Sequence, residues 1–464
     1  MNLLAYHTTS LALKVLTAFS RARVTLHNSE DMPAAGTIFV INHFTRLETL
    51  LLPYHISKLL GKPVWSLASD ELFNGLLGRY LDKVGAVSVQ DPERDNLIIK
   101  SLLSESAAWI IFPEGHMVKN RKVIDRGNFT IVDENGRHAP YTGAMALALK
   151  AEILRQRWRA LKEVRPDEDD NLLATFDISP TTDISAAINL VPVNVTYYPL
   201  RSADNLLHRF SSIMEEKISE RLLEEILVEG SMLLDGVDID IRFGQPVSVE
   251  PFVRRIFGRK IPELVDDRYS RSAIRRMTNC LMASIYNQTT VNLDHIIASL
   301  LYKTRGAKFT EAELRYRAFL VATSARLQPI YFRHRSLKKS QVDLLLEKEG
   351  GRITELLDFA REKSLLHDLA RHNLIFSDPE GTCDGHAFHR IRVDNPFCVM
   401  ANTVEPLRAL QRLLTKVNWL PAWYLKRLTA KRLLRIMEQI YICLLYTSDA
   451  ADDMQCVDLG GRRI

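Results

Sequence analysis

Short β-branched runs alternate with longer segments of helical periodicity from about residue 36 to residue 247. The runs cover residues 37–41, 64–68, 86–89, 109–112, 189–195 and 237–243. The segment 47–60 between the first two runs has a helical apolar face, bends at Pro53, and meets the helix stop signals Gly61 and Pro63. Such alternation is typical of α/β layer folds. We therefore predict an α/β fold in which a mixed sheet is flanked by helices.

The strand signal fades after Pro251, and the pattern is mostly helical from there to residue 442. The clearer helical pieces are residues 311–326, 338–349, 353–372 and 404–416. A chain of 464 residues exceeds one ordinary core, so two or three domains are expected. We predict an amphipathic N-terminal helix over residues 1–22, an α/β domain over 23–250, and a mostly helical C-terminal domain over 251–442.

The last segment, residues 443–464, has a different origin from the rest. It opens with the letters CLLYTSDAAD, which resemble the translation of a sequencing adapter, so we exclude it as non-native. Removing its four Asp and two Arg leaves 59 basic and 52 acidic residues, a net charge of +7 instead of +5. The two signs are mixed along the chain, and the composition does not call for a nucleic-acid partner.

The cysteines and the apolar runs bear on location. The five cysteines (Cys280, Cys383, Cys398, Cys443 and Cys456) show no tight repeated spacing, which argues against a disulfide framework and favours a reducing, cytosolic compartment. No stretch reaches about 18 uninterrupted apolar residues, the length of a spanning helix. The apolar segment at residues 1–19 is broken by polar residues and is expected to lie on a surface.

The first candidate for chemistry is His43, which stands where an apolar strand ends and a helix begins. Functional groups of α/β folds gather at the carboxyl ends of strands, and a histidine can accept a proton near neutral pH. If the residues after His43 are loop, Glu48 can turn back and hold one imidazole nitrogen. Taken alone, a histidine with an acidic residue nearby is more often an ordinary loop histidine than a catalytic base.

A second strand runs into a turn at residues 110–116, with the sequence IIFPEGH. Glu114 would be costly as a buried charge unless it met donors there, and Gly115 is free to adopt backbone angles that other residues avoid. An ordinary Pro-Glu-Gly turn is the alternative reading. A third strand, at residues 189–195, contains Pro192, which lacks a ladder donor and indicates an edge strand or a site wall.

These three segments, in this order, resemble the glycerolipid acyltransferase family, which includes glycerol-3-phosphate and lysophosphatidic acid acyltransferases. That family carries an N-H-x-x-x-x-D block, a glycine-led strand block, an F-P-E-G block and a V-P-V-like block. His43, the block at residues 112–115 and Val191-Pro192-Val193 fall in register with it, and the resemblance covers roughly residues 20–250. It implies that residues 23–250 are an acyltransferase catalytic domain.

The resemblance implies roles for individual residues. His43 would be the general base, and Glu48 would orient its imidazole. The acceptor would be bound by Arg46, Phe112, Pro113, Glu114, Gly115 and His116. Acyl-CoA or an acyl-carrier protein would be co-substrate, with no bound cofactor and no metal. The acceptor would be a lipid or a glycerol phosphate, and the protein would sit peripherally on the cytoplasmic side of a membrane.

The chain departs from the family pattern in three places. Glu48 stands where the family has Asp, His116 and Met117 follow the F-P-E-G block in place of threonine and arginine, and the glycine-led block at 85–91 lacks its arginine. Both arginines are phosphate ligands in the family. Their replacements here would be Arg46, Arg94, Lys119, Arg121 and Lys122. Two alternatives follow: a catalytically inactive lipid-binding relative, and an acyltransferase for a non-phosphorylated acceptor.

Two further patterns concern binding. Cys383, Asp384, His386 and His389 lie close in sequence, but zinc sites use four ligands at regular spacing, and no second pair accompanies them, so we expect no metal site. Near residue 442, tryptophans at 419 and 423 are followed by a series of basic residues. This mixture fits a membrane surface, and it fits equally a solvated basic helix packed on the domain.

Overall fold

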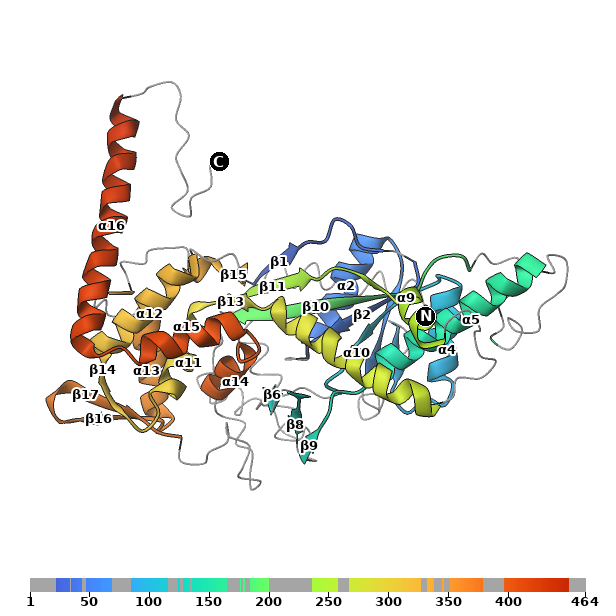
Figure 1. Ribbon diagram of the computed structural model, residues 1–464, viewed down its shortest axis with the longest axis horizontal. Helices are drawn as coiled ribbons and strands as arrows, with labels where there is room; N and C mark the ends of the chain where they lie inside the picture. The colour runs from blue at the N-terminus through green and yellow to red at the C-terminus, as the bar shows by residue number, and fades with distance from the viewer. Residues whose placement is uncertain are drawn as a thin grey trace, which may run out of the picture. The chain divides into compact units, whose positions relative to one another are not determined.

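The fold is taken from a computed structural model, and it divides into two compact units (Figure 1). The first unit comprises residues 1–119 and 125–288, and the second comprises 120–124 and 289–464. The structure describes residues 22–33, 35–43, 47–68, 85–115, 124–125, 128–133, 136–164, 176, 178–179, 184–199, 236–257, 267–326, 332–337, 344–345, 351–378 and 396–449. Residues 1–21 of the expected N-terminal helix lie outside these ranges, and so do residues 383–389, where we expect no metal site.

The first unit is built on an eight-stranded mixed sheet, in the order β1-β11-β10-β2-β5-β3-β4, with β12 added beside β10. Its strands are β1 (Arg23–His27), β2 (Thr37–Ile41), β3 (Val64–Ala68), β4 (Ala86–Ser88), β5 (Ala108–Ile111), β10 (Asn189–Tyr198), β11 (Asp238–Phe243) and β12 (Val247–Ser248). The strands β10, β2, β5, β3 and β4 run parallel, and β11 is antiparallel to β10. Every residue of β2 is buried, as expected for a central parallel strand covered on both faces. The predicted α/β fold is confirmed.

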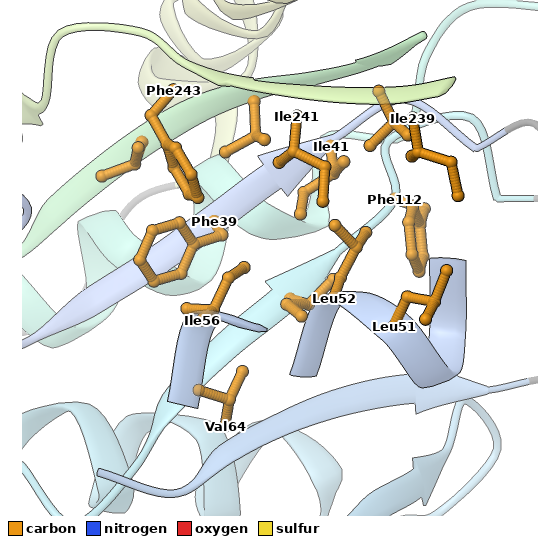
Figure 2. Packing of buried hydrophobic residues seen from close by; sticks show 14 of the residues in the cluster. Phe39, Ile41, Leu51, Leu52, Ile56, Val64, Phe112, Ile239, Ile241 and Phe243 are labelled. Carbon is orange, nitrogen blue, oxygen red and sulfur yellow. The ribbon is translucent and has the colours of Figure 1, made fainter. Parts of the chain in front are cut away.

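One face of the sheet is covered by α2 (Leu47–Leu60), which continues through Pro53. Leu51, Leu52 and Ile56 of this helix pack against a buried cluster that includes Phe39 and Phe243, whose rings meet edge to face (Figure 2). Phe112 belongs to the same cluster. The core on this face therefore reaches from the middle of the sheet to the carboxyl end of β5.

Helices α4 (Arg94–Leu103), α5 (Gly143–Val164) and α10 (Asp267–Asn287) cover the other face (Figure 1). The indole of Trp109 in β5 donates to the hydroxyl of Ser101 in α4 at 2.6 Å, which ties this layer to the sheet. α5 contacts both α4 and α10, and α10 lies on β10 and β2. Short hairpins, β6 (Ile124–Asp125) with β7 (Asn128–Phe129) and β8 (Ile131–Asp133) with β9 (Gly136–His138), follow β5.

The boundary between the units differs from the one expected at residue 250. Helix α9 (Glu250–Phe257) contacts α5, and α10 packs on the sheet, so both belong to the first unit, which ends at Gln288. The helical periodicity after Pro251 was read as a new domain because sequence gives no indication of which surface a helix covers. Helix α10 completes the α/β layer.

Pro192 indicated either an edge strand or a site wall, and the edge strand is wrong, because β10 lies between β2 and β11. The carbonyl of Pro192 accepts from the N–H of Gly244 at 2.8 Å, so the nitrogen of Pro192 faces the same neighbour. β10 pairs with β11 over residues 193–198 and with β12 over residues 189–190, so neither strand pairs with β10 at Pro192. The missing donor therefore falls in a gap of the ladder.

The second unit is mostly helical, and it also contains two small sheets. Its helices are α11 (Leu293–Lys303), α12 (Glu311–Arg326), α13 (Arg352–Glu362), α14 (Pro396–Thr403), α15 (Arg408–Asn418) and α16 (Ala422–Asp449). The strands β13 (Thr290–Val291) and β15 (Phe332–Arg333) form one sheet, and β14 (Lys308–Thr310), β17 (Asn373–Phe376) and β16 (Leu366–Leu369) form the other. The predicted helix 353–372 ends at α13 because Ser364 takes a φ of 57° and β16 follows. Helix 311–326 coincides with α12.

A buried polar group organises the start of α11. Asn292 caps the helix by accepting from the N–H of His295, whose Nδ1 accepts in return from the N–H of Asn292 at 3.3 Å. Burial is the main cause that lowers the pKa of His295, to about 4; nearby Asp294 opposes this shift and His334 adds to it. Arg352 pairs with Asp294 at 2.7 Å. His295 is therefore neutral at physiological pH and serves as a hydrogen-bond acceptor.

Two results concern the cysteines and membrane crossing. Cys280 is a free, exposed thiol, whereas Cys398 in α14 is disulfide-bonded. The sequence argued against a disulfide framework, and it gave no sign that Cys398 is bonded, because spacing along the chain does not reveal which distant cysteines meet. Within the described ranges, no helix combines the length and apolar character needed to cross a bilayer.

Candidate active site

The two loops that carry the predicted site meet because their strands are neighbours. β2 and β5 run parallel with Val40 opposite Ile111, so the residues that follow each strand emerge at the same edge of the sheet. His43 follows β2, and Phe112 and Glu114 follow β5. This edge is where α/β folds place functional groups.

His43 and Glu48 form a hydrogen-bonded pair. The Nδ1 atom of His43 lies 2.9 Å from Oε2 of Glu48, and the glutamate side chain is fully buried while the imidazole is 12% exposed. An ionised carboxylate can only accept, so Nδ1 carries the hydrogen and Nε2 carries the lone pair. Glu48 lies in the first turn of α2, and the expectation that it reaches back to the imidazole is confirmed.

A tyrosine holds the other oxygen of this carboxylate. The hydroxyl of Tyr197 in β10 donates to Oε1 of Glu48 at 3.1 Å. Glu48 is thereby fixed between β10 and His43, and the extra methylene relative to Asp is used to span that gap. A carboxylate with both oxygens engaged keeps the imidazole in one orientation.

Glu114 supports the same histidine through its backbone. Its Oε2 accepts from the N–H of His43 at 2.9 Å, and its Oε1 accepts from the hydroxyl of Tyr286 in α10 at 2.6 Å. The residue is completely buried, and these donors offset the cost of burying its charge. The expectation that Glu114 must meet donors is confirmed.

Two further contacts restrict the movement of His43. Its ring stacks on Phe112 with centroids 4.2 Å apart and planes inclined by 21°. Just before it, the side chain of Asn42 exchanges two hydrogen bonds with the backbone of Val195, at 3.0 Å and 2.8 Å. The histidine is thus held by its ring, its peptide and its neighbour in sequence.

The turn after β5 requires a glycine. Gly115 has a φ of 77°, and its N–H donates to the carbonyl of Phe112 at 3.1 Å. A Cβ at this position would collide with the ring of Tyr141, whose own N–H donates to the carbonyl of Pro113 at 2.7 Å. Pro113 is buried and Gly115 is exposed. The ring of Tyr141 can therefore pack against the turn only because residue 115 has no side chain.

The remaining site predictions divide into those that the structure describes and those that it does not. Arg46 and His116, predicted to bind the acceptor, lie outside the described residues. So do three of the basic residues considered as phosphate ligands, Lys119, Arg121 and Lys122. The remaining candidate, Arg94, pairs with Asp95 at 2.7 Å at the start of α4. Among the described residues, no three His, Cys, Asp or Glu side chains are grouped as a metal site.

Sequence reasoning missed Tyr197, Tyr286 and the role of Asn42. Tyr197 could have been found, because period-two alternation from Val193 and Val195 places it on the same face of β10. No sequence signal marked Tyr286, which lies 172 residues from its partner on a helix that was assigned to another domain.

Comparisons with known proteins agree with the sequence resemblance. Residues 23–157 match the family model Acyltransferase, and this segment includes His43, Glu48 and the block at 112–115. Among solved structures, the chain is similar to the 1-acyl-sn-glycerophosphate (LPA) acyltransferase PlsC of Thermotoga maritima, with 12% sequence identity and a TM-score of 0.28, over 60% of this chain and 81% of that chain. No curated protein matches the sequence.

Proposed function

We propose, from the match of residues 23–157 to the Acyltransferase family model, that the chain transfers a fatty acyl group from a thioester to a hydroxyl of a glycerol 3-phosphate or lysophosphatidate type acceptor. The donor would be acyl-CoA or an acyl-carrier protein. The observation that supports this most strongly is the 2.9 Å contact between His43 Nδ1 and Glu48 at the carboxyl end of β2. This is the arrangement of a general base and its orienting carboxylate.

The chemistry follows from the tautomer. Nε2 of His43 removes the proton of the acceptor hydroxyl as its oxygen attacks the thioester carbonyl, which forms the new C–O bond and a tetrahedral intermediate. The C–S bond then breaks, and the imidazolium returns the proton to the leaving thiolate. Glu48 stabilises the imidazolium during this interval, and its own hydrogen bond from Tyr197 keeps it in place. No protein nucleophile is required.

We assign Glu114 a positioning role in this reaction. Both of its oxygens accept from protein donors, and one of those donors is the peptide N–H of the base. A carboxylate that holds the peptide of His43 limits the movement of the imidazole relative to the substrate. Pre-organisation of this kind contributes to catalysis because small displacements of a base slow the reaction steeply.

Replacement of His43 by Ala tests the proposal directly. We expect thiol release from an acyl thioester, in the presence of acceptor, to fall by about 10²–10⁴-fold, the contribution of a general base. His367→Ala is the matched control, because His367 is an exposed histidine of the second unit and its loss should leave the rate unchanged. Circular dichroism establishes that both variants fold. A His43→Ala variant that is folded and as active as the wild type would overturn the proposal.

The same assay separates the alternatives from the main proposal. A catalytically inactive lipid-binding relative would release no thiol with any acceptor, and His43→Ala would leave its lipid binding intact. The acceptor is identified by a panel of glycerol 3-phosphate, lysophosphatidate and neutral lysolipids. Turnover with the phosphorylated acceptors supports the proposal, whereas turnover restricted to neutral lysolipids means that the acceptor carries no phosphate.

A further inference from the structure

The second unit exposes large apolar side chains next to a concentration of positive charge. Trp419, at the end of α15, is 82% exposed and Trp423, at the start of α16, is 67% exposed. Leu434 and Met437 of α16 are 60% and 56% exposed. We call these four residues, together with Lys416, Lys426, Arg427, Lys431 and Arg435, the aromatic–basic surface. Two tryptophans exposed to this degree are unusual on a protein surface and point to an interaction site.

The helix presents this surface because its opposite side is already packed. Leu425 and Thr429 are buried one turn apart in α16, which runs along α12 (Figure 1). The last residues of this helix, 443–449, belong to the segment excluded as non-native, and the surface lies entirely before them. Arg432, on the same side, donates to the backbone carbonyl of Thr323 in α12 at 3.2 Å. At about 100° per residue, Trp423 and Leu434 point away from Leu425. The exposed apolar residues are therefore not the part of the helix that packs on its own domain.

The charged side chains of this region are all positive. Between Glu405 and Glu438 there are eight basic residues and no acidic residue. The five basic members of the aromatic–basic surface are all exposed. A surface of one sign without internal pairing attracts a partner of the opposite sign. The partner is therefore anionic.

The combination of charge and apolar side chains favours a lipid bilayer over a nucleic acid. Lysine and arginine bind anionic headgroups, and tryptophan prefers the boundary between headgroups and acyl chains. Leu434 and Met437 gain from entering an acyl layer, whereas a phosphodiester backbone offers them no apolar contact. The side chains thus match a membrane interface in both charge and polarity.

We propose that the aromatic–basic surface docks the protein on an anionic lipid bilayer, with Trp419 and Trp423 inserted at the headgroup boundary. This docking goes beyond the proposed acyl transfer and does not depend on it, since every residue involved lies in the second unit. It gives the protein a second-unit anchor for working at a surface where glycerolipids are concentrated.

The test is co-sedimentation of the full chain with phosphatidylcholine vesicles that contain or lack phosphatidylglycerol. We expect binding only to the anionic vesicles, weakening as salt is raised. Near an anionic bilayer each basic residue strengthens binding about fivefold, so Lys426→Glu with Lys431→Glu should weaken it at least tenfold. Trp419→Ser with Trp423→Ser should also weaken it at least tenfold and abolish the fluorescence blue shift on binding. Lys308→Glu with Arg371→Glu, which reverses two exposed charges elsewhere in the second unit, should bind as the wild type.

Several results would overturn the docking surface. One is wild-type protein that does not bind anionic vesicles. Another is a set of surface variants that bind these vesicles as tightly as the wild type. Binding of a polynucleotide that is lost with the lysines and unaffected by the tryptophans would identify a nucleic-acid site instead. A dimer that dissociates in the tryptophan variant would identify an interface between copies. Thiol release from a short-chain thioester with soluble glycerol 3-phosphate should be unchanged in every surface variant, so failure of docking and failure of catalysis are separately visible.

Discussion

Replacing Tyr286 by Phe removes the hydroxyl that holds Glu114, the residue that in turn holds the peptide of the candidate base. That hydroxyl donates to the buried carboxylate of Glu114 at 2.6 Å, and a hydrogen bond to a charged group contributes about 1.5–3 kcal/mol. The ring itself is retained, including its stacking with Phe129 at a centroid distance of 6.1 Å. The change therefore isolates the hydrogen bond, and we expect the free energy of unfolding to fall by about 1.5–3 kcal/mol.

The effect on activity follows from the second contact of Glu114. With one donor lost, the carboxylate is held by the N–H of His43 alone among its two described donors, and the base becomes less precisely placed. We expect kcat to fall about tenfold with little change in KM, because the substrate is bound as before while the reacting geometry is loosened. Urea unfolding and steady-state thiol release measure the two quantities on the same preparation.

A matched variant separates positioning from general destabilisation. Tyr302→Phe removes a similar bond, from a tyrosine hydroxyl to Asp378 at 3.1 Å, in the second unit. It should lower stability and leave kcat unchanged. The reasoning fails if Tyr286→Phe has wild-type stability and wild-type kcat, or if both variants lower kcat to the same extent.

Three further predictions concern other sites. Glu48→Asp shortens the side chain that reaches His43 at 2.9 Å, so kcat should fall about tenfold or more, although Asp is the residue of the family pattern; steady-state rates decide. Gly115→Ala places a methyl group against the ring of Tyr141 at a φ of 77°, and should lower the free energy of unfolding by about 1–3 kcal/mol. Burial lowers the pKa of His295 from 6.5 to about 4, so the stability present above pH 6.5 should decline as pH falls toward 4, by on the order of 3 kcal/mol. In His295→Gln, urea unfolding between about pH 7 and pH 5 should show a shallower decline; an unchanged pH dependence would refute the assignment.

The parts of the fold that sequence predicted are those set by local pattern. β2 is an almost entirely apolar run because both of its faces are covered, and α2 ends where Gly61 and Pro63 forbid continuation. His43 and Glu48 lie five positions apart, at the end of β2 and in the first turn of α2, and the ordered blocks of the family resemblance identified them as a candidate site. Burial pattern and turn chemistry were sufficient for these elements.

The parts that sequence did not predict depend on partners distant along the chain. Pro192 suggested an edge, yet the gap it occupies is created by the residues between β11 and β12. Tyr286 contacts Glu114 only because α10 packs on the sheet. Helical periodicity indicates that a helix has an apolar face and does not indicate which surface that face covers. The sequence therefore could not show that Tyr286 holds Glu114.

Asn42 determines how fast the candidate base can move. β2 ends at Ile41, yet the next side chain continues the pairing by exchanging two hydrogen bonds with Val195 in β10. A histidine on an independent loop would sample new positions within nanoseconds to microseconds. His43 is adjacent to a residue locked to a central strand, and its backbone can leave only when that part of the sheet opens, a far rarer event. The lifetime of the active geometry is thereby tied to the lifetime of the sheet.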